Sequence, residues 1–189
     1  MLAYVFRHWP KLTVSAEEYE AALAAFHRAL NAPPPQPSGA SGNAAKASAV
    51  FRVAKASWLP AGRTGYEDWY LLENAAAIDG LNEAAVSGAR MEPHNRVAAM
   101  AQTGIGALYT LAAGQCDFGK VSRAAWFSKP RGVPYDAFYQ RLEPWSLRAP
   151  LFRRQMVLGP PPEFGMLDPR EPLPADLRPV TVSMARVYP

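Results

Sequence analysis

The stretches AYVFRHWPKLTVSAEEYEAAL (residues 3–23) and AAWFSKPRGVPYDAFYQRLEP (residues 124–144) follow one plan, and this repetition decides the predicted fold. Each begins with a short aromatic run that favours a β-strand and that a proline ends, Pro10 in the first and Pro130 in the second. Each then continues into a segment whose apolar side chains recur at helical spacing. The chain therefore contains a strand followed by a helix at two distant places.

The first of these helices carries a start signal. Ser15 and Glu18 form a Ser-x-x-Glu capping box, which satisfies free backbone amides at the start of a helix. We expect the helix to end before residues 32–48, because this stretch is rich in Pro, Ala, Ser and Gly and predicts a mobile loop. The apolar face of the helix comprises Tyr19, Ala22, Leu23, Phe26 and Leu30.

The rest of the first half completes the order strand, helix, strand, strand, helix, strand, which is that of a ferredoxin-like unit. The Gly-Ile-Gly run at residues 104–106 precedes a predicted strand and lacks the third glycine of a dinucleotide-binding fingerprint, so we interpret it as a turn. The predicted strands are residues 2–9, 49–59, a run from 66 and 107–111, and the helices are about 75–86 and from 93 to about 103.

The second half, after the linker GQCDFG, repeats this order with one omission. A strand at 124–129 precedes a helix opened by Pro134, and strands follow from residues 151, 163 and 181. The place of the second helix is taken by PREPLPADLRPV, whose four prolines oppose a helix, so the second copy is shortened. The matched positions are Tyr19 and Leu23 with Phe138 and Leu142, Val50, Phe51 and Arg52 with Leu151, Phe152 and Arg153, and Asp68 with Glu163.

We therefore predict an α+β chain of tandem ferredoxin-like repeats, with units at residues 1–114 and 121–189. A duplicated unit of this kind resembles the dimeric α+β barrel superfamily, on the basis of element order and the internal repeat over most of the chain. The resemblance implies two antiparallel sheets packed against each other as a pseudo-dimeric barrel. Both faces of strands such as AYVF and AAWF would then be buried, in agreement with their continuous apolar runs.

The resemblance implies a general class of function and no particular reaction. Members include cofactor-free monooxygenases, isomerases and dehydratases, haem enzymes, and proteins without known activity, and their ligand pockets lie between sheet and helices or inside the barrel. We expect a protein that binds a small organic molecule, either a cofactor-free enzyme acting on an aromatic or polyketide-like compound or a non-catalytic sensor or interaction module. The sequence identifies no cofactor, and it is compatible with a monomer or a homodimer.

Composition excludes several other classes. The chain has 189 residues, 49% hydrophobic content and a net charge of +4, which suit a buried core and not a disordered chain. Binding to nucleic acid would need a dense basic stripe, but the best candidate is the pair Arg153 and Arg154. The single cysteine, Cys116, excludes an intrachain disulfide and a Cys-rich zinc site. We expect no signal peptide, no membrane partner and a cytoplasmic location, because no apolar run approaches the about 20 residues of a membrane helix.

Three residues are the candidates for catalysis. His8, near the end of the first strand, suits a general base and, in the alternative, a haem ligand or only a polar strand end. Glu67 and Asp68 point to opposite faces of a strand, so one must be buried, and Asp68 is the candidate because it matches Glu163 in the second half. Arg153, with Arg52 in the first half, is the expected partner of such an acid. The pair is either a structural ion pair or a clamp for an anionic ligand.

In the catalytic reading, His8 moves a proton, Asp68 orients it and Arg153 holds an anionic oxygen. Aromatic residues on the strands would form the walls of the pocket or, in the alternative, only the core. The two remaining histidines, His27 and His94, are expected at the surface. The predicted ligand-binding residues are Trp9, Tyr66, Trp69, Trp126, Lys129 and Gln155.

Overall fold

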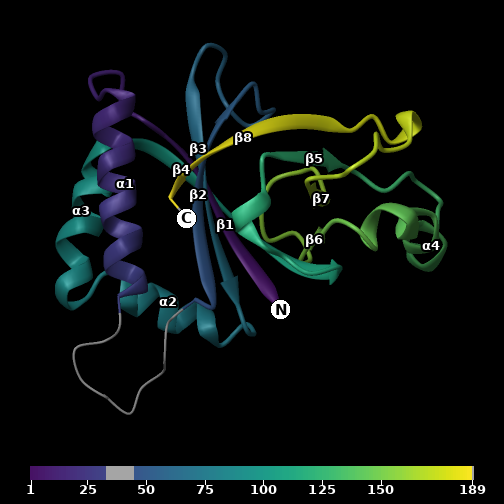
Figure 1. The fold of residues 1–189 in the computed structure, drawn as a ribbon, viewed down its shortest axis with the longest axis horizontal. Coiled ribbons are helices and arrows are strands. Elements are labelled where there is room, and N and C mark those ends of the chain that lie inside the picture. The colour runs from purple at the N-terminus through teal and green to yellow at the C-terminus, as the bar shows by residue number, and fades with distance from the viewer. Residues whose placement is uncertain (33–44, 189) are drawn as a thin grey trace.

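Eight antiparallel strands close into a barrel in the computed structural model, which describes residues 1–32 and 45–188. The strand order around the barrel is β1-β3-β2-β8-β5-β7-β6-β4, and β4 pairs with β1 to close it. Four α-helices accompany these strands in the described part of the chain (Figure 1). The strands are β1 (Leu2–Pro10), β2 (Ala47–Ala54), β3 (Thr64–Leu72), β4 (Ala101–Ala113), β5 (Arg123–Phe127), β6 (Leu151–Arg154), β7 (Phe164–Leu167) and β8 (Val180–Tyr188). The helices are α1 (Ala16–Asn31), α2 (Ala77–Ala85), α3 (Met91–Met100) and α4 (Tyr135–Ser146).

The barrel consists of two groups of four neighbouring strands. The N-terminal quartet has the order β4-β1-β3-β2, and the C-terminal quartet has the order β8-β5-β7-β6. Two antiparallel ladders join the quartets, one between β2 and β8 and the other between β4 and β6. The halves of the chain are therefore connected by backbone hydrogen bonds along both seams of the barrel.

Helices cover the outside of each quartet unequally. In Figure 1, α1, α2 and α3 gather on the N-terminal quartet, whereas α4 lies at the opposite side of the molecule. The amide of Glu18 donates to Ser15 Oγ at 3.2 Å, so the predicted capping box supplies a cap for α1. The predicted apolar face of α1 is buried in full. Where the second half was expected to lack a helix, the chain forms one short 3₁₀ turn, Ala175–Leu177.

Side chains of the strands alternate between the barrel interior and the helical layer, and both sides are buried. On β1, Ala3 and Val5 pack into the interior cluster, while Leu2 packs against the helices. The interior also contains Trp69 and Trp126, whose ring centroids are 6.1 Å apart. The expectation of burial on both faces is confirmed for AAWF, whereas in AYVF the helix-side residues Tyr4 and Phe6 are only partly buried.

The predicted turn at residues 104–106 is wrong, because these residues lie inside β4. The glycines leave room for aromatic rings of the neighbouring strand: a Cβ atom on Gly104 would lie 2.0 Å from Phe6 Cζ, and one on Gly106 would lie 2.8 Å from the Tyr4 hydroxyl. In this strand, glycine marks the close approach of a side chain. The preceding helix accordingly ends at Met100 and not near residue 103.

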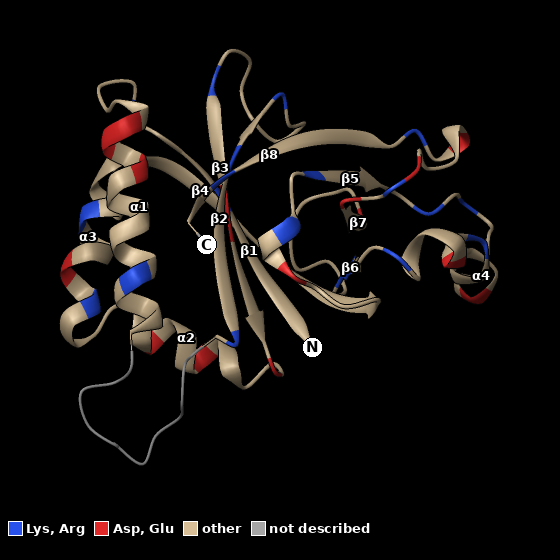
Figure 2. Ribbon diagram, viewed as in Figure 1, with Lys and Arg blue, Asp and Glu red and all other residues tan. Residues whose placement is uncertain are grey.

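Charged side chains are interspersed over the helices and loops, while the strands carry few (Figure 2). None of the described helices has the length and apolar character needed to cross a bilayer. The loop predicted at residues 32–48 lies mainly outside the described residues, and its last residues begin β2.

Candidate functional site

A cavity of about 710 Å³ lies between the N-terminal quartet and helices α1, α2 and α3. This helix–sheet cavity has a volume within the range of about 300–1,000 Å³ that is common for ligand pockets. Its sheet wall comes from β1, β3 and β4, and its residues include Tyr4, Phe6, Asp68, Tyr70 and Gly104. Gly104 lies in this wall, so the close packing of Phe6 over β4 shapes the cavity directly.

His8 and Asp68 meet at this wall, where Asp68 lines the cavity and His8 is buried beside it. β1 and β3 pair with Phe6 opposite Asp68, which places His8 and Asp68 as diagonal neighbours on the helix side of the sheet. His8 Nε2 lies 3.0 Å from Asp68 Oδ1, and both side chains are almost fully buried, at 1% and 5% exposure. An ionised carboxylate only accepts hydrogen bonds, so the Nε2–H group of His8 donates to Asp68.

Tyr19 of α1 completes a chain of three side chains. Its hydroxyl lies 2.7 Å from His8 Nδ1. Burial, together with the negative charge of Asp68 and the neighbouring Tyr66, raises the pKa of Tyr19 far above its ordinary value, so the group remains a phenol. In the tautomer that carries its proton on Nε2, His8 accepts the hydrogen bond of the Tyr19 hydroxyl at Nδ1. This Tyr19–His8–Asp68 chain has the arrangement of a hydroxyl beside a base that a third group orients.

The second oxygen of Asp68 faces a further polar cluster. Tyr70 donates its hydroxyl to Asp68 Oδ2 at 3.3 Å and lies 3.2 Å from His27 Nε2. His27 Nε2 is 3.6 Å from Asp68 Oδ2, and its other ring nitrogen lies 3.0 Å from Ser48 Oγ. Tyr70 thus bridges Asp68 and His27.

The expected surface position of His27 is wrong, because this side chain is fully buried. The signal lay in the helical spacing: Tyr19, Leu23 and His27 are separated by four residues each and share one face of α1. His94 is also not fully exposed; it lines the helix–sheet cavity and packs edge-on against Phe26, with ring centroids 5.6 Å apart. Sequence reasoning missed both because it followed apolar residues alone.

Asp68 stays ionised in this environment. Burial alone would raise its pKa, but the positive charge that His8 carries in its protonated form, followed by the contacts of His27 and His8, outweighs burial and holds the pKa of Asp68 well below its usual range. The cavity wall also includes the carboxylate of Asp79, and none of its described lining residues is Lys or Arg. The charge of the cavity therefore favours neutral or cationic ligands over anions.

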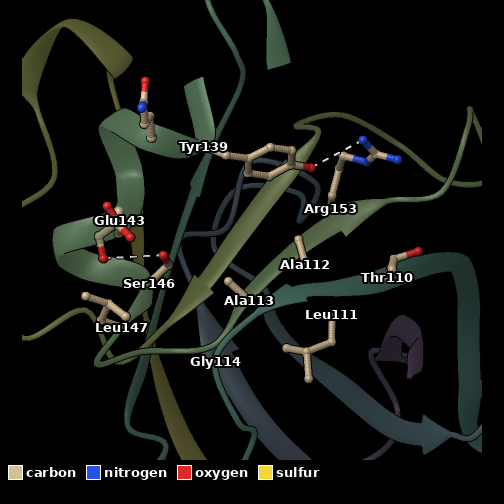
Figure 3. A pocket seen from close by; sticks show the side chains of 11 residues that line it. Thr110, Leu111, Ala112, Ala113, Gly114, Tyr139, Glu143, Ser146, Leu147 and Arg153 are labelled. Carbon is tan, nitrogen blue, oxygen red and sulfur yellow. Dashed lines mark hydrogen bonds between the residues drawn. The ribbon is translucent and has the colours of Figure 1, made fainter. Parts of the chain in front are cut away.

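The predicted arginine partners lie elsewhere. Arg52 pairs with Glu20 of α1 at 2.9 Å, and Arg153 Nη1 donates to the Tyr139 hydroxyl of α4 at 3.2 Å. Arg153 lines a second cavity of about 730 Å³ between α4 and the strands β4 and β6 (Figure 3). The expected ion pair of Asp68 with an arginine is thus wrong, and the three candidate catalytic residues divide between two cavities.

The match of Asp68 with Glu163 is also wrong. Phe6 pairs with Asp68 on β3, and Phe127, which holds the same position in the second quoted stretch, pairs with Phe164 on β7. Through the matched residues Val50 and Leu151, the partner in the place of Asp68 is Met166. Phe164 and Met166 share one face of β7, and an odd slip in the alignment assigns a side chain to the opposite face.

The predicted aromatic walls belong to the barrel interior. Trp69 and Trp126 point to the face of the sheet opposite Asp68, because successive side chains of a strand alternate. Trp69 donates its Nε1–H to Glu67 at 3.1 Å, and Trp9 stacks on Trp58 with centroids 6.2 Å apart. None of the three predicted tryptophans lines the helix–sheet cavity.

The polar residues predicted with them are also bound locally. Tyr66 is buried below α1 and donates to Glu20 at 3.0 Å, with its ring centroid 5.9 Å from that of His8. Lys129 donates to the Val133 carbonyl at 2.6 Å. Gln155 accepts from Thr110 at 3.4 Å. Of the nine predicted site residues, Asp68 lines the helix–sheet cavity, His8 is hydrogen-bonded to Asp68, and Tyr66 stacks on His8.

Two other chemistries find little support in this arrangement. Within the described residues, no group of three or more His, Cys, Asp and Glu side chains could hold a metal ion. Burial, followed by the charge of Asp117, raises the pKa of the Cys116 thiol to about 12. That thiol is therefore protonated at neutral pH and a poor nucleophile.

Comparison with known proteins identifies a fold and no family. No protein-family model and no curated protein matches the chain. A structure of a Fusobacterium nucleatum subsp. nucleatum protein, described as a candidate monooxygenase, aligns with a TM-score of 0.60 and 8% identity over 98% of this chain and 92% of its own.

Two further solved structures are more distant. An anthrone oxidase-like protein has a TM-score of 0.49 and 8% identity, over 98% of this chain and 90% of its own. An Arabidopsis thaliana protein has a TM-score of 0.44 and 16% identity, over 61% of this chain and all of its own. At such identities the likeness concerns the fold alone. With its closed eight-stranded barrel, the chain has the dimeric α+β barrel fold within a single polypeptide.

Proposed function

We propose that the protein is a cofactor-independent enzyme that removes a proton from an aromatic, polyketide-like molecule held in the helix–sheet cavity. The observation that carries this proposal is the Tyr19–His8–Asp68 chain at the cavity wall. A buried network of this kind brings no advantage in stability over apolar packing, so a role in chemistry accounts better for it.

The proton would move along the chain in one direction. Asp68 accepts the Nε2–H bond of His8, which fixes the tautomer whose basic Nδ1 faces Tyr19. As Tyr19 takes a proton from an acidic C–H or O–H group of the ligand, it passes its own proton to His8 Nδ1. The ionised Asp68 stabilises the imidazolium that forms. His8 itself is buried and not among the cavity-lining residues, so Tyr19 is the group that meets the ligand.

The lining favours a flat and uncharged ligand. Tyr4, Phe6, Phe26 and Tyr70 give the cavity aromatic surfaces. The negative charge of Asp68 and Asp79 disfavours a substrate that is already anionic when it binds. Isomerisation, dehydration and reaction of a carbanion with oxygen all begin with this proton removal. The description of the Fusobacterium protein as a candidate monooxygenase agrees with the last of these.

The alternatives fit the geometry less well. A non-catalytic module would be favoured by a sealed layer between helices and sheet, whereas this layer contains a cavity of about 710 Å³. A haem ligand needs a free imidazole nitrogen, but Tyr19 and Asp68 engage both nitrogens of His8 and the ring is buried. His8 therefore does not fit the role of an axial ligand.

The test is proton exchange, which does not depend on the later reaction. Anthrone and dihydroxynaphthalenes are incubated with the protein in D₂O, and loss of the acidic C–H signal is followed by NMR. We expect the wild-type protein to accelerate exchange and Tyr19→Phe to lower the rate by about 10²–10⁴-fold, the usual contribution of a positioned acid or base. Tyr66→Phe is the matched control, because Tyr66 is equally buried but donates to Glu20. Equal rates for wild type and Tyr19→Phe would contradict the proposal.

We also propose that the chain consists of two ferredoxin-like units, residues 1–114 and 121–189, which arose by internal duplication, with the second unit shortened. The order fourth, first, third and second strand in both quartets supports this division. The helices α1 and α4, each between the first and second strands of a quartet, support it further.

A further inference from the structure

Four buried side-chain nitrogens have no hydrogen-bond partner among the described residues. They are Arg7 Nη1, Trp58 Nε1, Trp126 Nε1 and Arg154 Nε. All four are N–H donors, and no buried side-chain oxygen of the described chain is left without a partner in the same way. Buried donors are rarely left unpaired, so a surplus of donors alone indicates a ligand that accepts hydrogen bonds.

Three of these donors gather around Tyr109 in the barrel interior. Arg7 Nη2 donates to the Tyr109 hydroxyl at 3.1 Å, and the Arg7 guanidinium lies 4.4 Å from the centre of the Trp126 ring. The rings of Tyr109 and Trp126 are 5.5 Å apart. Arg154 is the residue directly opposite Tyr109 in the β4–β6 ladder. Strands β1, β5 and β6 thus each contribute one unpaired donor to the surroundings of Tyr109.

The charges at this end do not balance. Glu67 is engaged at both oxygens, because Oε1 accepts from Arg7 Nε at 3.1 Å and Oε2 accepts from Trp69 Nε1 at 3.1 Å. Arg154 donates to the Gly159 carbonyl at 2.8 Å and forms no ion pair within the described residues. Two guanidinium groups, one buried and one half-buried, thus lie near Tyr109 with a single carboxylate, which favours an additional negative charge.

We propose that this end of the barrel binds a small monovalent anion, a halide or a carboxylate group, through Arg7, Trp126 and Arg154. The ligand is small because Trp69, Tyr109 and Trp126 pack closely around the position. Arg154 is only half-buried and gives an anion a path from solvent. The site lies on the face of the sheet opposite the helix–sheet cavity, so it is independent of the proposed proton transfer.

Thermal unfolding tests the proposal. The unfolding midpoint of the full chain is measured while sodium chloride or sodium formate replaces sodium gluconate at constant ionic strength, since gluconate is too large for a packed interior. We expect a saturable rise of the midpoint, as for a ligand that binds only the folded state. In Arg154→Gln the half-saturating concentration should increase by about tenfold, the effect of one hydrogen bond to a charged group.

Arg153→Gln is the matched control. It removes the same charge from the adjacent residue, whose side chain points to the outside of β6 toward Tyr139, and it should leave the half-saturating concentration unchanged. Trp126→Phe removes one N–H donor and keeps an aromatic ring. If Arg154→Gln does not fold, the half-saturating anion concentration of Trp126→Phe is measured in its place and should increase in the same way. A response to chloride alone identifies a halide site, and a response to formate alone identifies a carboxylate site.

Two results would overturn the proposal. The first is a wild-type midpoint that is the same in gluconate, chloride and formate, which would mean that water serves these donors. The second is an identical dependence on anion concentration in Arg154→Gln and Arg153→Gln, which would reveal a general salt effect.

Discussion

The two helix–sheet layers are built on quartets with the same strand order, but one contains a buried polar network and the other contains packed aromatic rings. Under α1, the outer face of the sheet carries His8 and Asp68 in a hydrogen-bonded network. Under α4, the aromatic rings of Phe127, Phe138 and Phe164 occupy the corresponding face of the sheet, with ring centroids 5.2–6.4 Å apart. These rings show that the fold does not require polar groups at these positions. The network under α1 is therefore a local feature of one half of the chain.

Away from the network, the layers share a contact between strand and helix. Arg52 of β2 reaches Glu20 of α1, and Arg153 of β6 reaches Tyr139 of α4. In each helix the contacted residue directly follows the buried aromatic residue, Tyr19 or Phe138 in turn. The comparison thus separates contacts that belong to the shared architecture from those that belong to one half.

The largest expected effect comes from removing the centre of the network. Asp68→Ala leaves His8 and Tyr70 without their acceptor, and we expect the free energy of unfolding to fall by about 3–5 kcal/mol, as for a broken buried pair. Urea denaturation measures the change. Phe164→Leu, at the corresponding position of the apolar layer, is the control and should cost less than about 1.5 kcal/mol. Equal losses in the two variants would remove the contrast between the layers.

A smaller effect is expected from pH. The pKa of Asp68 in the folded protein lies below its unfolded value, so its stabilisation is complete above about pH 4 and is lost as the pH falls toward the lower, folded value. The stability gap between wild type and Asp68→Asn should therefore narrow below pH 4, by at most about 1.4 kcal/mol per pH unit.

Denaturation curves between pH 3 and pH 6 measure this gap. The free energy of unfolding of Phe164→Leu should change with pH in the same way as that of wild type, because no titratable group occupies that position. A gap between wild type and Asp68→Asn that is constant over this range would show that Asp68 is not held in its ionised form by its neighbours.

The smallest effect concerns the shared contact. The side chains of Arg52 and Glu20 are 48% and 25% exposed, so a double-mutant cycle should give a coupling energy below about 1 kcal/mol that decreases with added salt. The cycle for Arg153 and Tyr139 should show a weaker dependence on salt, because the tyrosine is neutral. A coupling energy between Arg52 and Glu20 that salt does not change would argue against a screened surface pair.

The order of elements could be predicted from the sequence, and the register of the strands could not. The proline-ended aromatic runs, the capping box at Ser15 and the four prolines of residues 169–180 are local signals, and the structure confirms the elements they predicted. Register depends on which residues of two strands lie opposite each other, and Glu163, which the sequence matched with Asp68, lies just before the start of β7. The duplication, the oligomeric state and the location in the cell stay predictions.

Only part of the site could be predicted, because strand pairing and helix packing bring its residues together and local sequence signals do not give these contacts. His8 and Asp68 were selected separately, and the pairing of β1 with β3 brings them to hydrogen-bond distance. Tyr19 was assigned to the apolar face of α1, and nothing in its spacing indicated that its hydroxyl would meet His8. Their catalytic roles stay predictions, as does that of Arg153.

The two seams of the barrel have a consequence for how such a site can change. In a symmetric pair of identical chains, every substitution occurs twice, so both layers must accept it. Here the β2–β8 and β4–β6 ladders join quartets of one polypeptide. Each layer is encoded separately, and assembly does not depend on protein concentration. One layer is thus free to specialise while its counterpart preserves the scaffold.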